Sequence, residues 1–126
     1  MGLEGHATVL LVDDVSRAAA YYRDRLGFEV TFFEKNPSHY AYASRDGVWL
    51  HFACFKDAPP RPNVEVVPPD MFDVYIYVDD LEELEKELGE RGADVIQPPA
   101  ATGYGMDEIR VRDPFGYILA FGKARA

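Results

Sequence analysis

Few side chains in this sequence stand in a context that supports covalent chemistry. The chain has three serines, Ser16, Ser38 and Ser44. None of them lies in the glycine-flanked strand-to-helix turn that exposes a catalytic serine. The only cysteine, Cys54, alternates away from His51 along the expected strand and is interpreted as a small core residue. One strand histidine and many aromatic rings remain, and these suit binding of planar rings or cations.

An internal repeat organises the elements that position these residues. Val12-Asp13-Asp14 recurs as Val78-Asp79-Asp80, 66 residues later. A β-type run precedes each triplet, and a helical segment follows it, ending at Gly27 in the first copy and Gly92 in the second. Arg45-Asp46, before a glycine and a strand-like run, is echoed later by Arg112-Asp113. An ordered match of separate blocks predicts two related modules.

Each module is expected to contain one strand, one helix and three further strands. Asp80 can cap the second helix with Glu83 as its capping-box partner, and Asp14 or Ser16 can cap the first. The strands expected after the helices are Phe28 to Glu34, His39 to Ser44 and Val48 to Phe55, then Asp94 to Gln97, Asp107 to Arg112 and Tyr117 to Gly122. Asp57 to Asp70 contains five prolines in fourteen residues and is predicted to be a linker without a helix or a central strand.

The order of these blocks resembles the vicinal oxygen chelate superfamily, which includes glyoxalase I, extradiol dioxygenases and bleomycin-resistance proteins. The run Tyr21-Tyr22-Arg23-Asp24-Arg25-Leu26-Gly27-Phe28 after Asp13 matches a family motif, as does Asp113-Pro114-Phe115-Gly116-Tyr117 before the last strand. The resemblance implies an α+β fold of two tandem βαβββ modules whose curved mixed sheets surround a ligand cup. We expect a single domain over residues 1–126, with modules at 7–56 and 71–123 and the linker at 57–70.

The resemblance also implies where a divalent metal would bind. Metal-binding members take one ligand from the first strand and one from the last strand of each module. Counted from the repeat, these positions are Ala7, His51, Asp73 and Ala120. Two alanines supply no donor atoms, whereas metal sites of these types use at least three protein ligands. His6 lies next to Ala7 but points to the opposite face of a strand. We therefore predict no metal and no other cofactor.

If those four positions face inward, alternation assigns the rest of the cup wall. The predicted ligand-binding residues are Phe33, Trp49, His51, Asp73, Tyr75, Tyr77 and Tyr104. Alternation leaves the facing of Tyr40 and Tyr42 open. An inward carboxylate needs a partner in an apolar setting, and His51 is the partner suggested for Asp73.

Three functions remain open from sequence. The first is a non-catalytic protein resembling the metal-free bleomycin-resistance branch, which sequesters an aromatic or cationic ligand such as an antibiotic. The second is a glyoxalase-like lyase or a dioxygenase-like enzyme with an atypical or absent metal site, in which His51 acts as general base. In the third, the cup is filled by its own aromatic side chains and the fold serves an interaction.

Composition narrows the partners. The formal charge of −9 argues against binding to a nucleic-acid backbone, and mainly keeps a small protein soluble. No apolar run is long enough to span a membrane. A single cysteine excludes an internal disulfide, and the N-terminus lacks signal-peptide features, so we expect a cytoplasmic protein. The resemblance implies a homodimer as well as a small-molecule ligand.

Overall fold

The computed structural model describes residues 1–33, 39–54, 60–69 and 71–126. The chain divides into two compact units, Met1–Pro60 and Arg61–Ala126. Each unit contains one four-stranded sheet of mixed direction with helices, so the predicted α+β architecture of two modules is confirmed. Two predicted strand ends, Glu34 and Phe55, lie outside the described residues. Within the described ranges, no helix is both long and apolar enough to cross a membrane.

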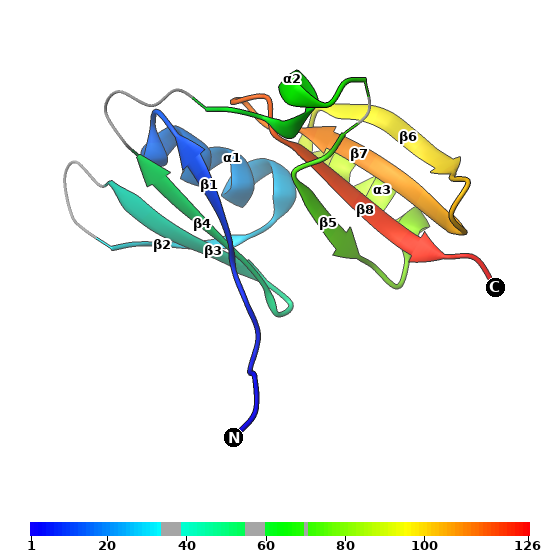
Figure 1. Cartoon of the computed structure of the whole chain (residues 1–126), viewed down its shortest axis with the longest axis horizontal. Helices are drawn as coiled ribbons and strands as arrows, with labels where there is room; N and C mark the ends of the chain where they lie inside the picture. Colours follow the sequence, from blue (N-terminus) through cyan, green and yellow to red (C-terminus); the bar gives the residue numbers. More distant parts are fainter. Residues whose placement is uncertain (34–38, 55–59, 70) are drawn as a thin grey trace. The chain divides into compact units, whose positions relative to one another are not determined.

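The first unit consists of β1 (Thr8–Val12), α1 (Val15–Leu26), β2 (Glu29–Phe32), β3 (Tyr40–Arg45) and β4 (Val48–Cys54) (Figure 1). Its sheet has the order β1-β4-β3-β2, with β1 parallel to β4 and the other pairs antiparallel. The carboxylate of Asp14 accepts the N–H of Arg17 at 3.0 Å and begins α1, and Gly27 ends it with φ 74°. The helix packs on the sheet through Tyr22, whose ring centroid lies 4.7 Å from that of Phe52.

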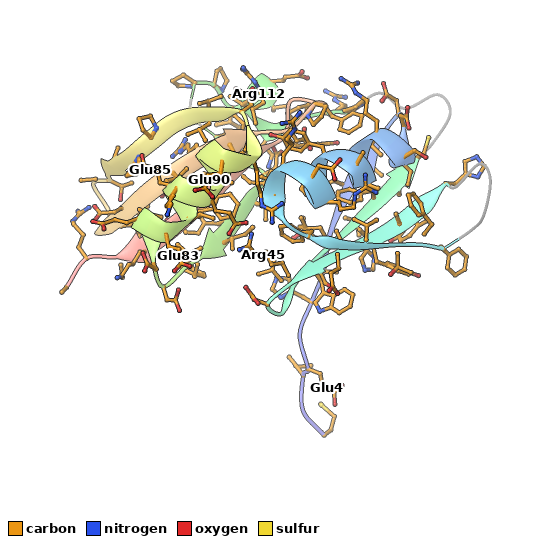
Figure 2. The ribbon with its side chains drawn as sticks, turned by 180° about the vertical axis from the view of Figure 1, so that it is seen from behind. Glu4, Arg45, Glu83, Glu85, Glu90 and Arg112 are labelled. Atoms are coloured by element: carbon orange, nitrogen blue, oxygen red, sulfur yellow. The ribbon has the colours of Figure 1, made fainter. Side chains whose placement is uncertain are left out.

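The second unit repeats this plan with β5 (Val74–Tyr77), α3 (Leu81–Arg91), β6 (Val95–Ala101), β7 (Met106–Arg112) and β8 (Ile118–Ala124). Its sheet has the order β5-β8-β7-β6, again with one parallel pair, β5 and β8. Asp80 accepts the N–H of Glu83 at 3.0 Å and begins α3, which packs on β6, β7 and β8. Figure 2 labels Glu83, Glu85 and Glu90 on this helix, which lies in front of its own sheet in that view.

Two expectations about secondary structure are wrong. The segment predicted as a linker without a helix contains α2 (Asn63–Val66), a single turn. Its prolines flank this turn rather than interrupt it, and Pro62 lies at the N-cap position, where a missing N–H costs nothing. Strand β6 was expected to end at Gln97 but continues to Ala101 across two prolines, with register shifts against β7. An edge strand tolerates prolines because its outer N–H groups need no partner in the sheet.

Candidate functional site

Each sheet has one side packed on its helix and one side facing away from it. In β4, Leu50 and Phe52 are buried towards α1, and Trp49 and His51 alternate onto the other side. Five aromatic or imidazole side chains gather there: Phe33, Tyr40, Tyr42, Trp49 and His51. We call this surface the aromatic face of the first sheet.

His51 lies at the centre of the aromatic face. Its Nδ1 is 2.8 Å from the hydroxyl of Tyr40, and its ring meets the ring of Tyr42 edge-on with centroids 4.7 Å apart. Phe33 lies beyond Tyr42, at a centroid distance of 6.5 Å. The facing of Tyr40 and Tyr42, which the sequence leaves open, is therefore the side of His51.

Large apolar groups of this face are exposed. The side chain of Trp49 is 48% exposed and that of Phe33 is 67% exposed. On the neighbouring strand β1, Val9 is paired in register with His51 and is 50% exposed. Most large apolar side chains of a small domain are buried, so a cluster of exposed ones is characteristic of a binding surface.

The equivalent side of the second sheet is closed by a hydrogen-bonded group around Glu108, which is fully buried. One carboxylate oxygen of Glu108 accepts the hydroxyl of Tyr75 at 2.7 Å and also accepts the hydroxyl of Tyr104. The other accepts the guanidinium of Arg110 at 3.1 Å, and Arg110 itself is only 12% exposed. We call Tyr75, Tyr104, Glu108 and Arg110 the Glu108 cluster.

The Glu108 cluster shifts the acidity of its members. Burial works to raise the pKa of Glu108, but the hydrogen bonds from Tyr104, Tyr75 and Arg110 outweigh it, so this pKa is lowered. Burial and the hydrogen bond to the carboxylate both raise the pKa of Tyr75. Burial around its hydroxyl and the same carboxylate raise the pKa of Tyr104. The carboxylate stays ionised and both phenols stay protonated at neutral pH, and the lowered pKa makes Glu108 a weaker base than an ordinary glutamate.

Other predicted site residues of the second unit also have roles within it. Tyr75 lies directly over Gly122, where a Cβ atom would come within 2.7 Å of the Tyr75 Cζ. The carboxylate of Asp73 accepts the backbone N–H groups of Asn63 at 2.8 Å and Ile118 at 2.9 Å. Asp73 therefore finds its partners inside its own unit, and the partner of His51 is Tyr40. Tyr77 is 78% exposed, with its ring 5.3 Å from that of Tyr75.

Comparison with known proteins assigns the family. The sequence profile of the Glyoxalase/Bleomycin resistance protein/Dioxygenase superfamily matches residues 5–121. The chain belongs to this superfamily. A search of curated proteins finds no match.

Solved structures of the superfamily fold superpose over nearly the whole chain. TioX from Micromonospora sp. ML1 gives a TM-score of 0.74 at 19% identity, over 97% of this chain and 99% of that one. The bleomycin-binding protein of bleomycin-producing Streptomyces verticillus, complexed with copper(II)-bleomycin, gives a TM-score of 0.72 at 22% identity, over 100% of this chain and 98% of that one. A superfamily member from Sphaerobacter thermophilus DSM 20745 gives 0.69 at 21% identity, over 98% of each chain. Identities this low establish the shared fold alone.

The residues at the four expected positions do not fit the divalent metal that the superfamily's metal-binding members hold. Ala7 and Ala120 occupy two of the four expected positions and supply no ligand. The Nδ1 of His51 is engaged by Tyr40, and both carboxylate oxygens of Asp73 accept backbone N–H groups. Across the described ranges, no three His, Cys, Asp or Glu side chains gather closely enough to hold a metal ion.

Sequence reasoning missed Glu108 and Arg110. The signal that could have found them is alternation in the strand predicted at Asp107 to Arg112, where Ile109 and Val111 are the core residues. The intervening positions lie on the same side as Ala120 and Gly122, which are their register partners in β8. A buried acid and a base two residues apart on that side predict an ion pair, because an isolated charge there would be costly.

Proposed function

We propose that this superfamily member binds a planar aromatic small molecule, neutral or cationic, on the aromatic face and sequesters it without catalysis and without a metal. The observation that carries the proposal is the set of exposed rings around His51. Trp49 and Phe33 offer stacking surface, and Tyr40 and Tyr42 hold His51 from the side. A mostly apolar surface with one oriented polar group is the usual composition of a ligand site.

Charge and fold give supporting arguments. The faces of aromatic rings attract cations, and a net charge of −9 raises the local concentration of a cationic ligand. A structural neighbour of the same superfamily is a bleomycin-binding protein, which supports an antibiotic as one ligand class. We also propose that the protein acts in the cytoplasm. We propose in addition that it forms a homodimer, since pairing of two copies would protect the open edges of its sheets.

The only tryptophan of the chain, Trp49, makes the proposal directly testable. A panel of planar compounds, such as acridinium and other aromatic cations together with neutral tricycles, is titrated while tryptophan fluorescence and thermal unfolding are followed. We expect at least one compound to quench the fluorescence and to raise the midpoint of unfolding, because a ligand of the folded state stabilises it by mass action.

Two variants locate the binding surface. Trp49→Ala should weaken binding of the active compound at least tenfold, measured by calorimetry. Phe32→Ala is the matched control. Phe32 is also an exposed ring of this sheet, but its register partner is the buried Ala41, so it lies on the opposite side from the aromatic face. The proposal fails if no compound binds or if both variants bind alike. Stoichiometric, tightly held Ni, Zn, Fe or Mn in the purified protein would contradict its metal-free part.

A further inference from the structure

We infer that His51 presents its Nε2–H to the ligand, and therefore that the bound compound carries a hydrogen-bond acceptor, such as a carbonyl oxygen, at the edge of its ring system. This inference rests on the proposed function and narrows the ligand to a chemical class. Among compounds of the same shape and charge, it favours those that carry such an acceptor.

The first step is the contact that fixes the imidazole. The Tyr40 hydroxyl and the His51 Nδ1 are 2.8 Å apart, and this is a hydrogen bond in which one of the two atoms must donate. The rings of Tyr40 and Tyr42 stand at 76° and 63° to the imidazole plane and limit its rotation. The tautomer of a neutral histidine is set by the hydrogen bond that one of its nitrogens makes.

The second step places the proton. A phenol O–H is the more acidic donor of this pair, and an sp² imidazole nitrogen is the better acceptor, so the favoured arrangement has Tyr40 donating to Nδ1. In a neutral ring the remaining proton then lies on Nε2. In a doubly protonated ring Nε2 carries a proton as well, so Nε2 is a donor in both states.

The third step is the surroundings of that donor. Among the residues that the structure describes, the imidazole of His51 makes no hydrogen bond other than the one to Tyr40. Its neighbours in register on the two adjoining strands are Val9, which is apolar, and Tyr42. The Tyr42 hydroxyl likewise has no hydrogen-bond partner in the described part of the chain. A ligand that covered Nε2–H without offering an acceptor would leave this donor without water and without a partner. The free-energy cost of such an unpaired donor is larger than the net gain from a typical hydrogen bond. The site therefore discriminates against compounds that lack an acceptor.

The donor can be tested without any ligand. Nitrogen-15 NMR of the imidazole side chains distinguishes the two tautomers, and His51 is assigned by comparison with His51→Gln. We expect the Nε2–H form in the native protein and a mixed population in Tyr40→Phe, where the constraint is removed. Tyr42→Phe is the matched control and should leave the His51 tautomer unchanged. An Nδ1–H tautomer of His51 in the native protein would overturn the inference whatever the protein binds.

The ligand class is tested with three tricycles of the same shape: fluorene, which has no polar group, carbazole, which has an N–H donor, and fluorenone, which has a carbonyl acceptor. We expect fluorenone to bind roughly tenfold more tightly than fluorene, the effect of one hydrogen bond on a surface that the ligand covers. Carbazole should bind less tightly than fluorenone, and Tyr40→Phe should reduce the fluorenone preference.

The outcomes separate the two proposals. Equal binding of all three tricycles would support the proposed function and overturn the acceptor requirement, as would tighter binding of carbazole than of fluorenone. If none of the three binds, the acceptor class is overturned, whereas the panel of aromatic cations still tests binding on the aromatic face and the NMR result still decides which nitrogen of His51 donates.

Discussion

The two sheets derive from one sequence repeat, yet their sides away from the helix differ. On the edge strands, Val9 of β1 corresponds by the repeat to Tyr75 of β5. On the inner strands, Tyr40 and His51 of the first sheet correspond to Glu108 and Ala120 of the second. In the second sheet, a large ring from the edge strand covers small residues and is anchored by a buried acid. In the first, a small edge residue leaves Trp49 exposed and Tyr40 and Tyr42 half-buried.

This exchange of large and small residues has a functional consequence. Filling a face with its own side chains gives stability, because the rings and the ion pair exclude water. Leaving the rings uncovered keeps apolar surface available for a ligand. The third alternative left open by the sequence was a surface filled by its own aromatic side chains. The second sheet has such a surface, whereas the first sheet retains the features of a binding surface.

The largest effect is expected from Glu108→Ala. The change removes the acceptor that the guanidinium of Arg110 and two hydroxyls share, and breaking a buried ion pair by removing one partner costs about 3–5 kcal/mol. Urea unfolding measures the loss. The control is Glu87→Ala, which removes a partly exposed i,i+4 pair with Arg91 on the surface of α3 and should cost no more than about 0.5 kcal/mol. Similar losses for the two variants would show that the Glu108 cluster does not stabilise the second unit.

Gly122→Ala tests how tightly Tyr75 covers the second sheet. A Cβ at this position would meet the Tyr75 hydroxyl and lie 2.8 Å from Cε1, so we expect overpacking to cost about 1–3 kcal/mol. The loss should disappear in the background of Tyr75→Ala, where the space is vacant. Gly89→Ala in α3 is the control, because its added Cβ would meet nothing within 4 Å beyond its chain neighbours and the backbone of its own helix. It should stabilise the helix by up to about 1 kcal/mol. An additive double variant would mean that Tyr75 does not occupy this place.

Acid should weaken the Glu108 cluster. The pKa of Glu108 is lowered in the folded protein, so the unfolded chain binds its proton more readily. Its contribution is present above the ordinary glutamate pKa of about 4.3 and is lost as the pH falls through the lower folded value. We expect the difference in unfolding free energy between the native protein and Glu108→Gln to shrink over that window. The other carboxylates titrate in both proteins and cancel, so a constant difference would contradict the lowered pKa.

The sequence predicts the fold better than it predicts this difference between the faces. The repeat, the capping residues Asp14 and Asp80 and the terminal glycines determine the order of elements, because each acts through its immediate neighbours. Alternation places Trp49 and His51 on one side of β4. It does not show that Tyr75 reaches Glu108, since that contact depends on which strands pair and on the small residue at Gly122. The partners of Asp73 were missed for the same reason, because they are backbone groups brought near by the fold.

Removing one tyrosine hydroxyl from each face should have the smallest effect on unfolding free energy, but it compares the two faces most directly. Tyr75→Phe removes a donor to a buried carboxylate and should cost about 1.5–3 kcal/mol, the range for hydrogen bonds to charged groups. Tyr40→Phe removes a bond to an imidazole on a part-buried face and should cost about 0.5–1.5 kcal/mol. Urea unfolding measures the loss of unfolding free energy in each variant. Tyr42→Phe is the control, because it deletes a hydroxyl without breaking any described hydrogen bond. A greater loss for Tyr40→Phe than for Tyr75→Phe would contradict the inference that the second face contributes more to stability than the first.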